Sequence, residues 1–422
     1  MIDTASSWVR IAPGSDFPLE NLPYGVFRSA HGEPHAGVAI GDAIFDLHEA
    51  TQAGLFDGIV SRPVLQAPTL NLLLAAGRQA WTALRERVHS LLREGTSELG
   101  GLNRDSLLAA RPQAQMLLPF AVGDYVDFYS SLEHATNLGK IFRPQGEPLM
   151  PNWRWIPIGY HGRSSTVVVD GTPIVRPKGQ RKPPDAPEPS FGPSRLLDIE
   201  LEVGFVTGPG NAMGHAIPIE SARDHIFGLV LVNDWSARDI QAWEYQPLGP
   251  FLGKSFATSV SPWVVTLDAL EPYRVSGPKQ DPQPLPYLRT PEPWNYDIAL
   301  LVELQTQKMR ESGVQAEIIS RSNFKYMYWS MAQQLAHATV NGTAVRPGDL
   351  YASGTISGPT PDSYGSFIEL TWRGTKPLQI RSGEQRSFLE DGDTVTLRGI
   401  CEAPGKPRIG FGSVSGTILP AS

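Results

Sequence analysis

The sequence predicts a mainly β protein of the α+β class, with short helices placed between strands. Residues 197–205 alternate apolar and polar side chains with a period of two, which is typical of a strand. Residues 226–233 form a nearly continuous apolar run, which indicates a strand buried on both faces. The 41 glycines and 38 prolines among 422 residues indicate many turns and long ordered loops.

Residues 1–118 are predicted to form a small separate domain that contains a β-hairpin. Strands are expected over residues 24–28 and 35–40. A two-residue turn at Gly41-Asp42 should then lead into a third strand over residues 43–47, because glycine suits the first central position of such a turn.

A helix is expected from Leu70 to Arg93, and Gly95 should end it. One helical face collects the apolar side chains of this segment, which are Trp81, Leu84, Val88, Leu91 and Leu92. Residues 111–120 are the predicted linker to a second domain over residues 119–422.

The second domain should combine further strands with two helices. Ser236 is a favourable N-cap for a helix over residues 237–244. A second helix is expected over residues 323–340, with its aromatic side chains in the core. Residues 366–372 are predicted to be a strand that points Glu369 away from its apolar neighbours.

Composition and charge argue against several classes of partner. The net charge is −7 and no basic tail or stripe occurs, so we expect no nucleic acid partner. No apolar run approaches 18 residues, so no membrane span is expected. Cys401 is the only cysteine, and the segment Met1–Ser7 lacks the features of a secretory leader. We therefore expect a cytoplasmic location.

The acidic side chains of the stretch 197–205 raise the question of a metal. Asp198, Glu200 and Glu202 would lie on one face of the strand, with neighbours about 7 Å apart. If water covers that face, the repulsion costs little. If the face lines a cleft, a positive charge must lie there, because an unpaired buried carboxylate is very costly. An all-oxygen set of ligands suits Mg²⁺ or Ca²⁺.

The chain offers a wider set of groups for catalysis, although their spacing alone is not diagnostic. Asp127, Glu200, Glu202 and Asp234 are the candidate metal ligands. His134 is the best candidate for a general base, because imidazole titrates near neutral pH, although a lone histidine is more often structural.

Three further side chains are candidates to stabilise an oxyanion. They are Arg238 and Gln241, which share one face of the predicted helix with Tyr245, and Lys254, which lies in a glycine-rich turn. Each of these is otherwise an ordinary surface or ion-paired residue. A serine hydrolase is disfavoured, because the sequence has no Gly-x-Ser-x-Gly elbow.

Five segments in order carry a specific resemblance to a known family. They are Gly123–Asn137, Gly159–Arg163, Asn233–Gln241, Gly249–Phe256 and Ala352–Gly358. With these motifs the chain resembles the fumarylacetoacetate hydrolase family from Ser15 almost to its C-terminus. The resemblance implies a small SH3-like N-terminal domain, a larger mixed β-sandwich roll that carries catalysis, and a homodimer.

The resemblance also implies roles for individual residues. His134 matches the general base and Glu369 the carboxylate that orients it. The implied ligands of a divalent metal are Asp127, Glu200, Glu202 and Asp234. Lys254 and Thr258 match positions of a further cation site, although an ammonium group has no lone pair to offer. The implied substrate-binding positions are Tyr129, Arg143, Tyr160, Gln241, Tyr245 and Thr355.

The activity implied by the resemblance is hydrolysis of a carbon–carbon bond in a small diketo acid with the help of Mg²⁺ or Ca²⁺. The expected reaction converts fumarylacetoacetate and water into fumarate and acetoacetate, the last step of tyrosine and phenylalanine breakdown. Two alternatives stay open. One is a glycosidase or a Ca²⁺-dependent sugar-binding module, although two acids on one strand face cannot flank a glycosidic bond. The other is a related diketo-acid hydrolase or decarboxylase.

Overall fold

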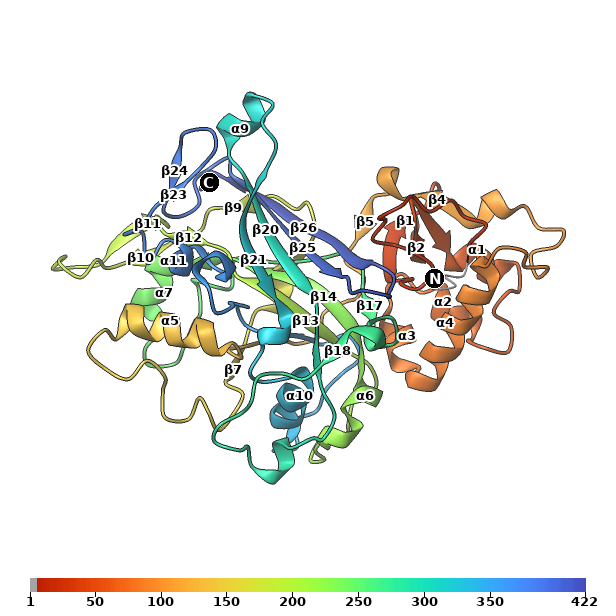
Figure 1. Cartoon of the computed structure of the whole chain (residues 1–422), viewed down its shortest axis with the longest axis horizontal. Coiled ribbons are helices and arrows are strands. Elements are labelled where there is room, and N and C mark those ends of the chain that lie inside the picture. Colours follow the sequence, from red (N-terminus) through yellow and green to blue (C-terminus); the bar gives the residue numbers. More distant parts are fainter. Residues whose placement is uncertain (1–5) are drawn as a thin grey trace.

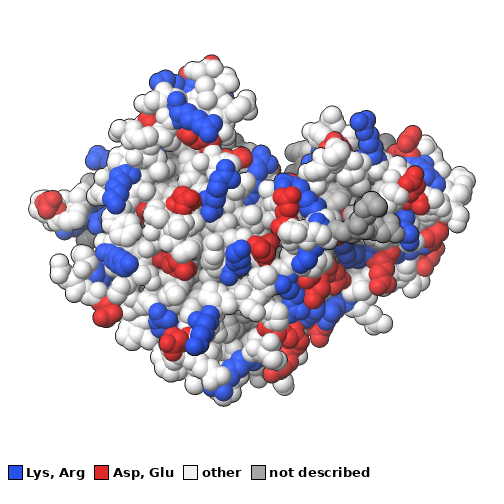
Figure 2. Space-filling view, viewed as in Figure 1, with Lys and Arg blue, Asp and Glu red and all other residues white. Residues whose placement is uncertain are grey.

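The computed structural model describes residues 6–422 and shows a sheet-rich, mixed α+β architecture. A small N-terminal part, red to orange in Figure 1, lies beside a larger part that contains two extended sheets. The segment Met1–Ser7 was predicted not to be a secretory leader, and its residues 1–5 lie outside the described residues. On the face drawn in Figure 2, basic and acidic side chains are interspersed.

The N-terminal part is built on a five-stranded antiparallel sheet with the strand order β4-β3-β2-β1-β5. The pairing of Ile40 with Ala43 confirms the predicted two-residue turn, and Gly41 there has a φ of 53°. The predicted linker is partly wrong, because β5 lies within it and pairs with β1. The strands are β1 (Tyr24–Arg28), β2 (Pro34–Ile40), β3 (Ala43–Asp46), β4 (Leu108–Ala110) and β5 (Met116–Leu117).

Four helices accompany this sheet, namely α1 (Leu47–Gln52), α2 (Arg62–Leu65), α3 (Asn71–Ala75) and α4 (Arg78–Leu92). The prediction of one helix from Leu70 to Arg93 is wrong, because the helix is interrupted at Gly77, where φ is 82°. A positive φ is cheap only for glycine, so this residue separates α3 from α4. The predicted apolar face of α4 is buried throughout, and this helix ends at Leu92, before Gly95.

An eight-stranded sheet forms the centre of the larger part, with the order β7-β6-β22-β13-β14-β16-β8 and with β17 paired to β14. The prediction that residues 226–233 are a fully buried strand is confirmed by β14. The strands are β6 (Tyr125–Phe128), β7 (Gly159–His161), β8 (Val167–Val169), β13 (Leu201–Thr207), β14 (Ile226–Asp234), β16 (Thr258–Val260), β17 (Val265–Thr266) and β22 (Leu350–Ala352).

The stretch 197–205 differs from the single strand that its alternation predicts. It forms β12 (Leu197–Asp198), which pairs with β15 (Ser236–Ala237), and then β13, which pairs with β14. Both faces are buried, so the reading of its acidic face as water-covered is wrong. The break between the two strands separates Asp198 from Glu200 and Glu202.

A second, five-stranded sheet has the order β21-β20-β25-β26-β9. Its strands β25 and β26 contact β14, and Gly399 on β25 lies against Leu231. The core of the larger part therefore lies between the two sheets. The strands are β9 (Ile174–Val175), β20 (Ala299–Gln305), β21 (Glu317–Asn323), β25 (Thr394–Cys401) and β26 (Ile409–Leu419).

Short elements complete the larger part. Its helices are α5 (Leu132–Phe142), α6 (Ala222–His225), α7 (Arg238–Glu244), α8 (Leu267–Leu270), α9 (Gln307–Glu311), α10 (Met331–Thr339) and α11 (Phe367–Leu370). Besides β12 with β15, three further two-stranded ribbons pair β10 (Lys178–Arg181) with β11 (Ser190–Pro193), β18 (Arg274–Val275) with β19 (Asn295–Tyr296), and β23 (Leu378–Gln379) with β24 (Gln385–Arg386).

Three predictions about these elements need correction. Ser236 is not an N-cap, because it lies in β15 and its hydroxyl donates to the Asp234 carbonyl. The helix predicted over 323–340 begins only at Met331, and its predicted first residue, Asn323, belongs to β21 instead. The aromatic side chains of the segment 323–340 are in the core, as expected. Residues 366–372 are not a strand, since α11 lies there.

The N-terminal part shares a continuous apolar core with the eight-stranded sheet. Trp81 on α4 packs edge-on against Phe227 on β14 at 5.1 Å between ring centroids. Tyr24 on β1 exchanges backbone hydrogen bonds with Val264. Among residues 6–422, no helix is both long and apolar enough to span a bilayer.

Candidate active site

A cavity of about 400 Å³ in the larger part gathers most of the predicted site residues. Predicted residues that line it are Asp127, Tyr129, His134, Arg143, Tyr160, Glu200, Arg238, Gln241, Tyr245, Lys254 and Thr355. The other four, Glu202, Asp234, Thr258 and Glu369, lie behind this wall and adjoin residues that line it. The fold thus brings together groups from β6, α5, β13, β14, α7 and α11.

Four buried carboxylates meet at one end of the eight-stranded sheet. Asp127 comes from β6, Glu200 and Glu202 flank the start of β13, and Asp234 ends β14. One oxygen from each lies within 4.8 Å of the others. The register that pairs Leu201 with Asn233 produces this meeting, because it sets the beginning of β13 beside the end of β14.

Two buried cations neutralise part of this charge. The Lys254 ammonium donates to Glu200 and, at 2.8 Å, to Asp234, and Arg238 Nη1 lies 2.8 Å from Glu200 Oε1. Burial raises the pKa of Glu200, but Lys254 and Arg238 outweigh that effect and hold the pKa below its usual range. Two cations cannot balance four carboxylates, and Arg238 also pairs with a fifth, Asp198.

Asp127 and Glu202 form no salt bridge with either cation, and Lys254 offsets only part of the unfavourable environment of these two groups. Burial, together with the neighbouring carboxylates, raises the pKa of both groups well above the usual range. Asp127 Oδ1 and Glu202 Oε1 are buried and have no hydrogen-bond partner. Buried polar atoms are rarely left without a partner. The donor set therefore fits a hard divalent cation, which prefers oxygen ligands and would satisfy both oxygens.

The two positions predicted for a further cation site have other contacts in the structure. Lys254 acts as a donor to carboxylates, as an ammonium group must. Thr258 Oγ1 donates to Asp234 Oδ1 at 2.8 Å. A second cation at these residues stays a prediction.

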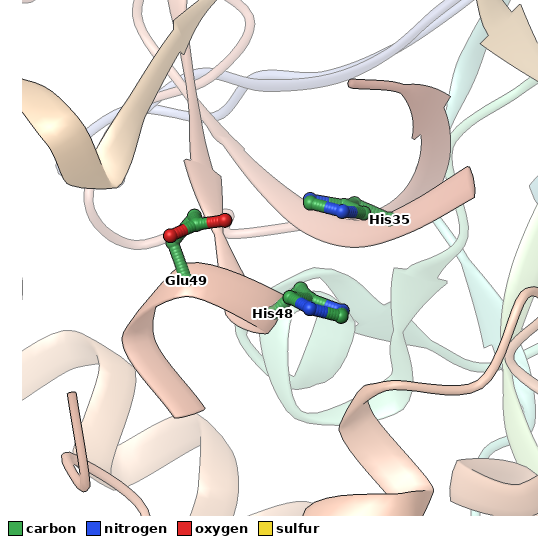
Figure 3. A group of neighbouring side chains, drawn as sticks. All are labelled: His35, His48 and Glu49. Atoms are coloured by element: carbon green, nitrogen blue, oxygen red, sulfur yellow. The ribbon is translucent and has the colours of Figure 1, made fainter. Parts of the chain in front are cut away.

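A second group of potential ligands, His35, His48 and Glu49, lies in the N-terminal part (Figure 3). The two imidazole rings are stacked at 4.1 Å between centroids, with an angle of 6° between their planes. Lone pairs of imidazole lie in the ring plane, so those of two stacked rings cannot converge on one ion. In addition, His35 Nδ1 is bonded to Asp46 at 2.8 Å. The carboxylate group is therefore the better candidate metal site.

His134 and Glu369 form a buried pair, although 235 residues separate them. His134 Nδ1 lies 2.7 Å from Glu369 Oε2, which leaves Nε2 as the nitrogen available to the cavity. Burial raises the pKa of Glu369, but His134, Asn137 and Ser366 outweigh that effect and hold the pKa below its usual range. Three side chains besides His134 donate to this carboxylate, Asn137 at 2.9 Å, Ser357 at 2.9 Å and Ser366 at 2.7 Å.

Arg238 and Gln241 lie on α7 and face the cavity together. Arg238 Nη1 donates to Gln241 Oε1 at 3.2 Å. Arg238 Nη2 is buried and has no hydrogen-bond partner, and the Arg238 side chain lines the cavity. The prediction that these residues share a helical face is confirmed.

The predicted substrate-binding side chains are spread around the cavity wall. The Tyr129 ring stands edge-on to His134 at 5.4 Å, and the Tyr160 hydroxyl lies 3.4 Å from Asp234. Burial raises the pKa of both phenols, so each hydroxyl keeps its proton and remains a donor at neutral pH. Thr355 Oγ1 is buried without a partner, whereas Tyr245 is 40% exposed. Arg143 is the C-cap residue that follows α5 and donates to the Pro148 carbonyl at 2.6 Å.

Sequence reasoning missed the polar groups that support these residues. Asn137, Ser357 and Ser366 were not singled out, although Asn137 stands three positions after His134 and so shares its helical face. Asp198 was recognised as acidic, but its bond to Arg238 was not anticipated.

Comparison with known proteins agrees with the geometry. Residues 125–419 match the family described as fumarylacetoacetate hydrolase C-terminal, and residues 20–119 match the family described as fumarylacetoacetase N-terminal. The chain is 53% identical to the fumarylacetoacetase of Homo sapiens over 422 residues, covering 98% of this chain and 99% of that protein. It is 50% identical to the fumarylacetoacetase of Arabidopsis thaliana over 420 residues, with 98% of each chain covered.

Two solved structures share the fold at low sequence identity. A fumarylacetoacetate hydrolase from Exiguobacterium antarcticum has a TM-score of 0.52 at 15% identity and covers 94% of this chain and 99% of its own. A maleylpyruvate hydrolase from Sphingobium has a TM-score of 0.50 at 14% identity, with 95% and 100% covered. At these identities the likeness concerns the fold alone.

Proposed function

Because the chain belongs to the fumarylacetoacetate hydrolase family, we propose that it hydrolyses the carbon–carbon bond of fumarylacetoacetate to give fumarate and acetoacetate. One observation carries this proposal. His134, Arg238 and two of the four carboxylates line one cavity, while Glu369 and the other two carboxylates lie directly behind its wall. This arrangement offers a base, an oxyanion donor and a cation site around a single substrate.

His134 activates the attacking water. Its Nε2 takes a proton from water, and the resulting hydroxide attacks the carbonyl carbon that becomes the new carboxylate of fumarate. Glu369 holds the ring in the tautomer that bears hydrogen on Nδ1, and its negative charge stabilises the imidazolium that forms. The proton taken from water ends on the carbon of the departing acetoacetate, so the atoms balance.

Three donors meet the oxyanion that develops after the attack. They are Arg238, Gln241 and Lys254, all of which line the cavity. Because the negative charge exists only after the attack, these donors lower the barrier rather than merely bind substrate. Arg143 supplies a guanidinium that can bind a carboxylate of the substrate.

The residues that would hold a metal are Asp127, Glu200, Glu202 and Asp234. When bound, a hard divalent cation such as Mg²⁺ or Ca²⁺ supplies Lewis acidity toward the two oxygens of a 1,3-diketone. The two unpartnered carboxylate oxygens support such an ion. Which of the two metals is used is part of the proposal.

The alternatives find less support in the geometry. Glycosidases place their two carboxylates on opposite sides of the scissile bond, about 5–9.5 Å apart, whereas the four carboxylates here form one compact group. A decarboxylase needs no attacking water, so the His134–Glu369 pair would have no role.

The proposal includes three features of the whole protein. The N-terminal part, residues 1–118, is an SH3-like domain and residues 119–422 form a mixed β-sandwich roll that carries catalysis. Two chains pair as a homodimer. The single cysteine, Cys401, can form no intramolecular disulfide, which supports a cytoplasmic location.

The test is hydrolysis in ¹⁸O-labelled water. One heavy oxygen should appear in the new carboxylate of fumarate, both in a single turnover and at steady state, and activity should fall in excess chelator. His134→Ala is the matched control, because it removes the base and leaves the carboxylate group intact. Release of CO₂ in place of acetoacetate, or fumarate without label, would contradict the assignment.

A further inference from the structure

Asp198 is a buried carboxylate that the mechanism above does not use. It lies at the end of β12, is fully buried and does not line the cavity. Its two oxygens nevertheless accept four hydrogen bonds, so all its usual acceptor positions are filled. Three of those bonds come from Arg238 and from the helix that carries Glu369, on which the proposed chemistry depends.

The first connection is to the oxyanion donor. Asp198 Oδ2 lies 2.9 Å from Arg238 Nε. The guanidinium group is planar with donors at fixed angles, so bonds at Nε and Nη1 determine where Nη2 points. Asp198 at Nε and Glu200 at Nη1 together leave Nη2 without a partner in the cavity wall.

The second connection is to the helix that carries Glu369. Asp198 Oδ1 accepts from Phe367 N at 2.7 Å, and Oδ2 accepts from Ile368 N at 3.0 Å. These are the first two N–H groups of α11, which have no partner within a helix. Ser366 would ordinarily cap them, but its hydroxyl donates instead to Glu369.

We infer that Asp198 is a positioning residue for the proposed hydrolysis, because it sets the direction of Arg238 Nη2 and anchors the start of the helix that presents Glu369 to His134. The inference rests on the proposed function and deepens it. One carboxylate thus couples the oxyanion donor to the base. This position is decided by the break in the stretch 197–205, which turns Asp198 away from the other carboxylates.

The variant Asp198→Asn keeps the size of the side chain but places an N–H₂ group against N–H donors. We expect kcat to fall about 10- to 100-fold, less than the loss from removing an oxyanion donor outright. KM should change less than about threefold, because no group that touches the substrate is removed. A phosphinate analogue of the tetrahedral intermediate should bind more weakly in proportion to kcat, whereas acetoacetate should bind as to the wild type.

Asp393→Asn is a matched control. Asp393 is equally buried, pairs with buried Arg386 through Nε at 2.9 Å and accepts Glu390 N at 2.9 Å, but it lies away from the cavity. This variant should lower the melting temperature to a similar degree and leave kcat and analogue binding unchanged. A second test compares Asp198→Asn in the wild type and in Arg238→Ala, where its effect should be smaller because the two residues act through one group.

The outcomes separate this inference from the proposed function. An inactive wild-type protein overturns the proposed function. If the wild type is active and a folded Asp198→Asn variant has the same kcat, the role of Asp198 is overturned. The same conclusion follows if Asp393→Asn loses as much kcat as Asp198→Asn does. It also follows if Asp198→Asn lowers kcat as much in the Arg238→Ala background as in the wild type. If Asp198→Asn does not fold, Asp198→Glu takes its place, because it keeps the charge but moves it by one methylene group. The same measurements of kcat and analogue binding then test the role of Asp198.

Discussion

Replacement of Glu369 by glutamine tests the base most directly. In the structure, this carboxylate accepts hydrogen bonds from His134, Asn137, Ser357 and Ser366. Glutamine offers one oxygen with two acceptor positions, so it cannot serve all four donors. If its amide nitrogen faces His134, the imidazole must carry its proton on Nε2, where it can no longer accept one from water.

The size of the effect follows from these contacts. Loss of a correctly oriented general base lowers kcat by about 10²–10⁴-fold. KM should change little, because Glu369 touches no cavity surface. At least one hydrogen bond to a charged group is lost, which costs about 1.5–3 kcal/mol of unfolding free energy. The variant should therefore fold, with a melting temperature lowered by several degrees.

The pH dependence of stability supplies an independent check. The pKa of Glu369 lies below its unfolded value of about 4.3, so its contribution to stability is present above that pH and is lost as pH falls through the folded pKa. The difference in unfolding free energy between wild type and Glu369→Gln should thus shrink as pH falls below about 4.5. Denaturant titrations at a series of pH values measure it.

The assay is the decrease in fumarylacetoacetate absorbance for the wild type, Glu369→Gln, His134→Ala and the double variant. The two residues act as a unit, so the double variant should be no worse than His134→Ala. Glu303→Gln is the control, since Glu303 pairs with Arg398 on the other sheet. A Glu369→Gln protein with wild-type kcat, or losses that multiply in the double variant, would refute the reasoning.

Two further predictions concern the carboxylate group. Glu202→Gln should lose activity and most affinity for Mg²⁺ or Ca²⁺, because one of the two unpartnered oxygens belongs to Glu202. Its circular dichroism spectrum should stay that of the wild type. A wild-type metal affinity in a calorimetric titration of this variant would count against the site. Lys254→Met should destabilise the fold by about 3–5 kcal/mol, because Glu200 and Asp234 lose their shared buried cation. Added divalent metal should recover part of that stability in thermal melts, and no recovery would argue against a metal at these carboxylates.

Local sequence patterns were enough to predict the elements whose residues all have the same kind of surroundings. The run 226–233 forms β14, and the turn at Gly41-Asp42 joins β2 to β3, because each depends only on neighbouring residues. The apolar face of α4 was also predicted correctly. The motif segments indicated most of the residues that line the cavity.

Short elements with mixed environments could not be predicted in this way. Residues 366–372 have apolar neighbours on either side of Glu369, and in a four-residue helix the periods of 2 and 3.6 cannot be told apart. Likewise, the alternating pattern of residues 197–205 does not show where β12 ends and β13 begins, because both strands are buried. Tertiary pairing with β15 and β14 decided where the break falls.

The partners of the site residues were decided by the tertiary structure alone. His134 meets Glu369 across 235 residues, and Asp198 reaches α11 across 169 residues. Such contacts depend on how buried polar groups satisfy one another once the sheets have packed, and no periodicity in the sequence reports that choice. The sequence by itself therefore determined which chemical groups are present, whereas packing decided which of them share a hydrogen bond.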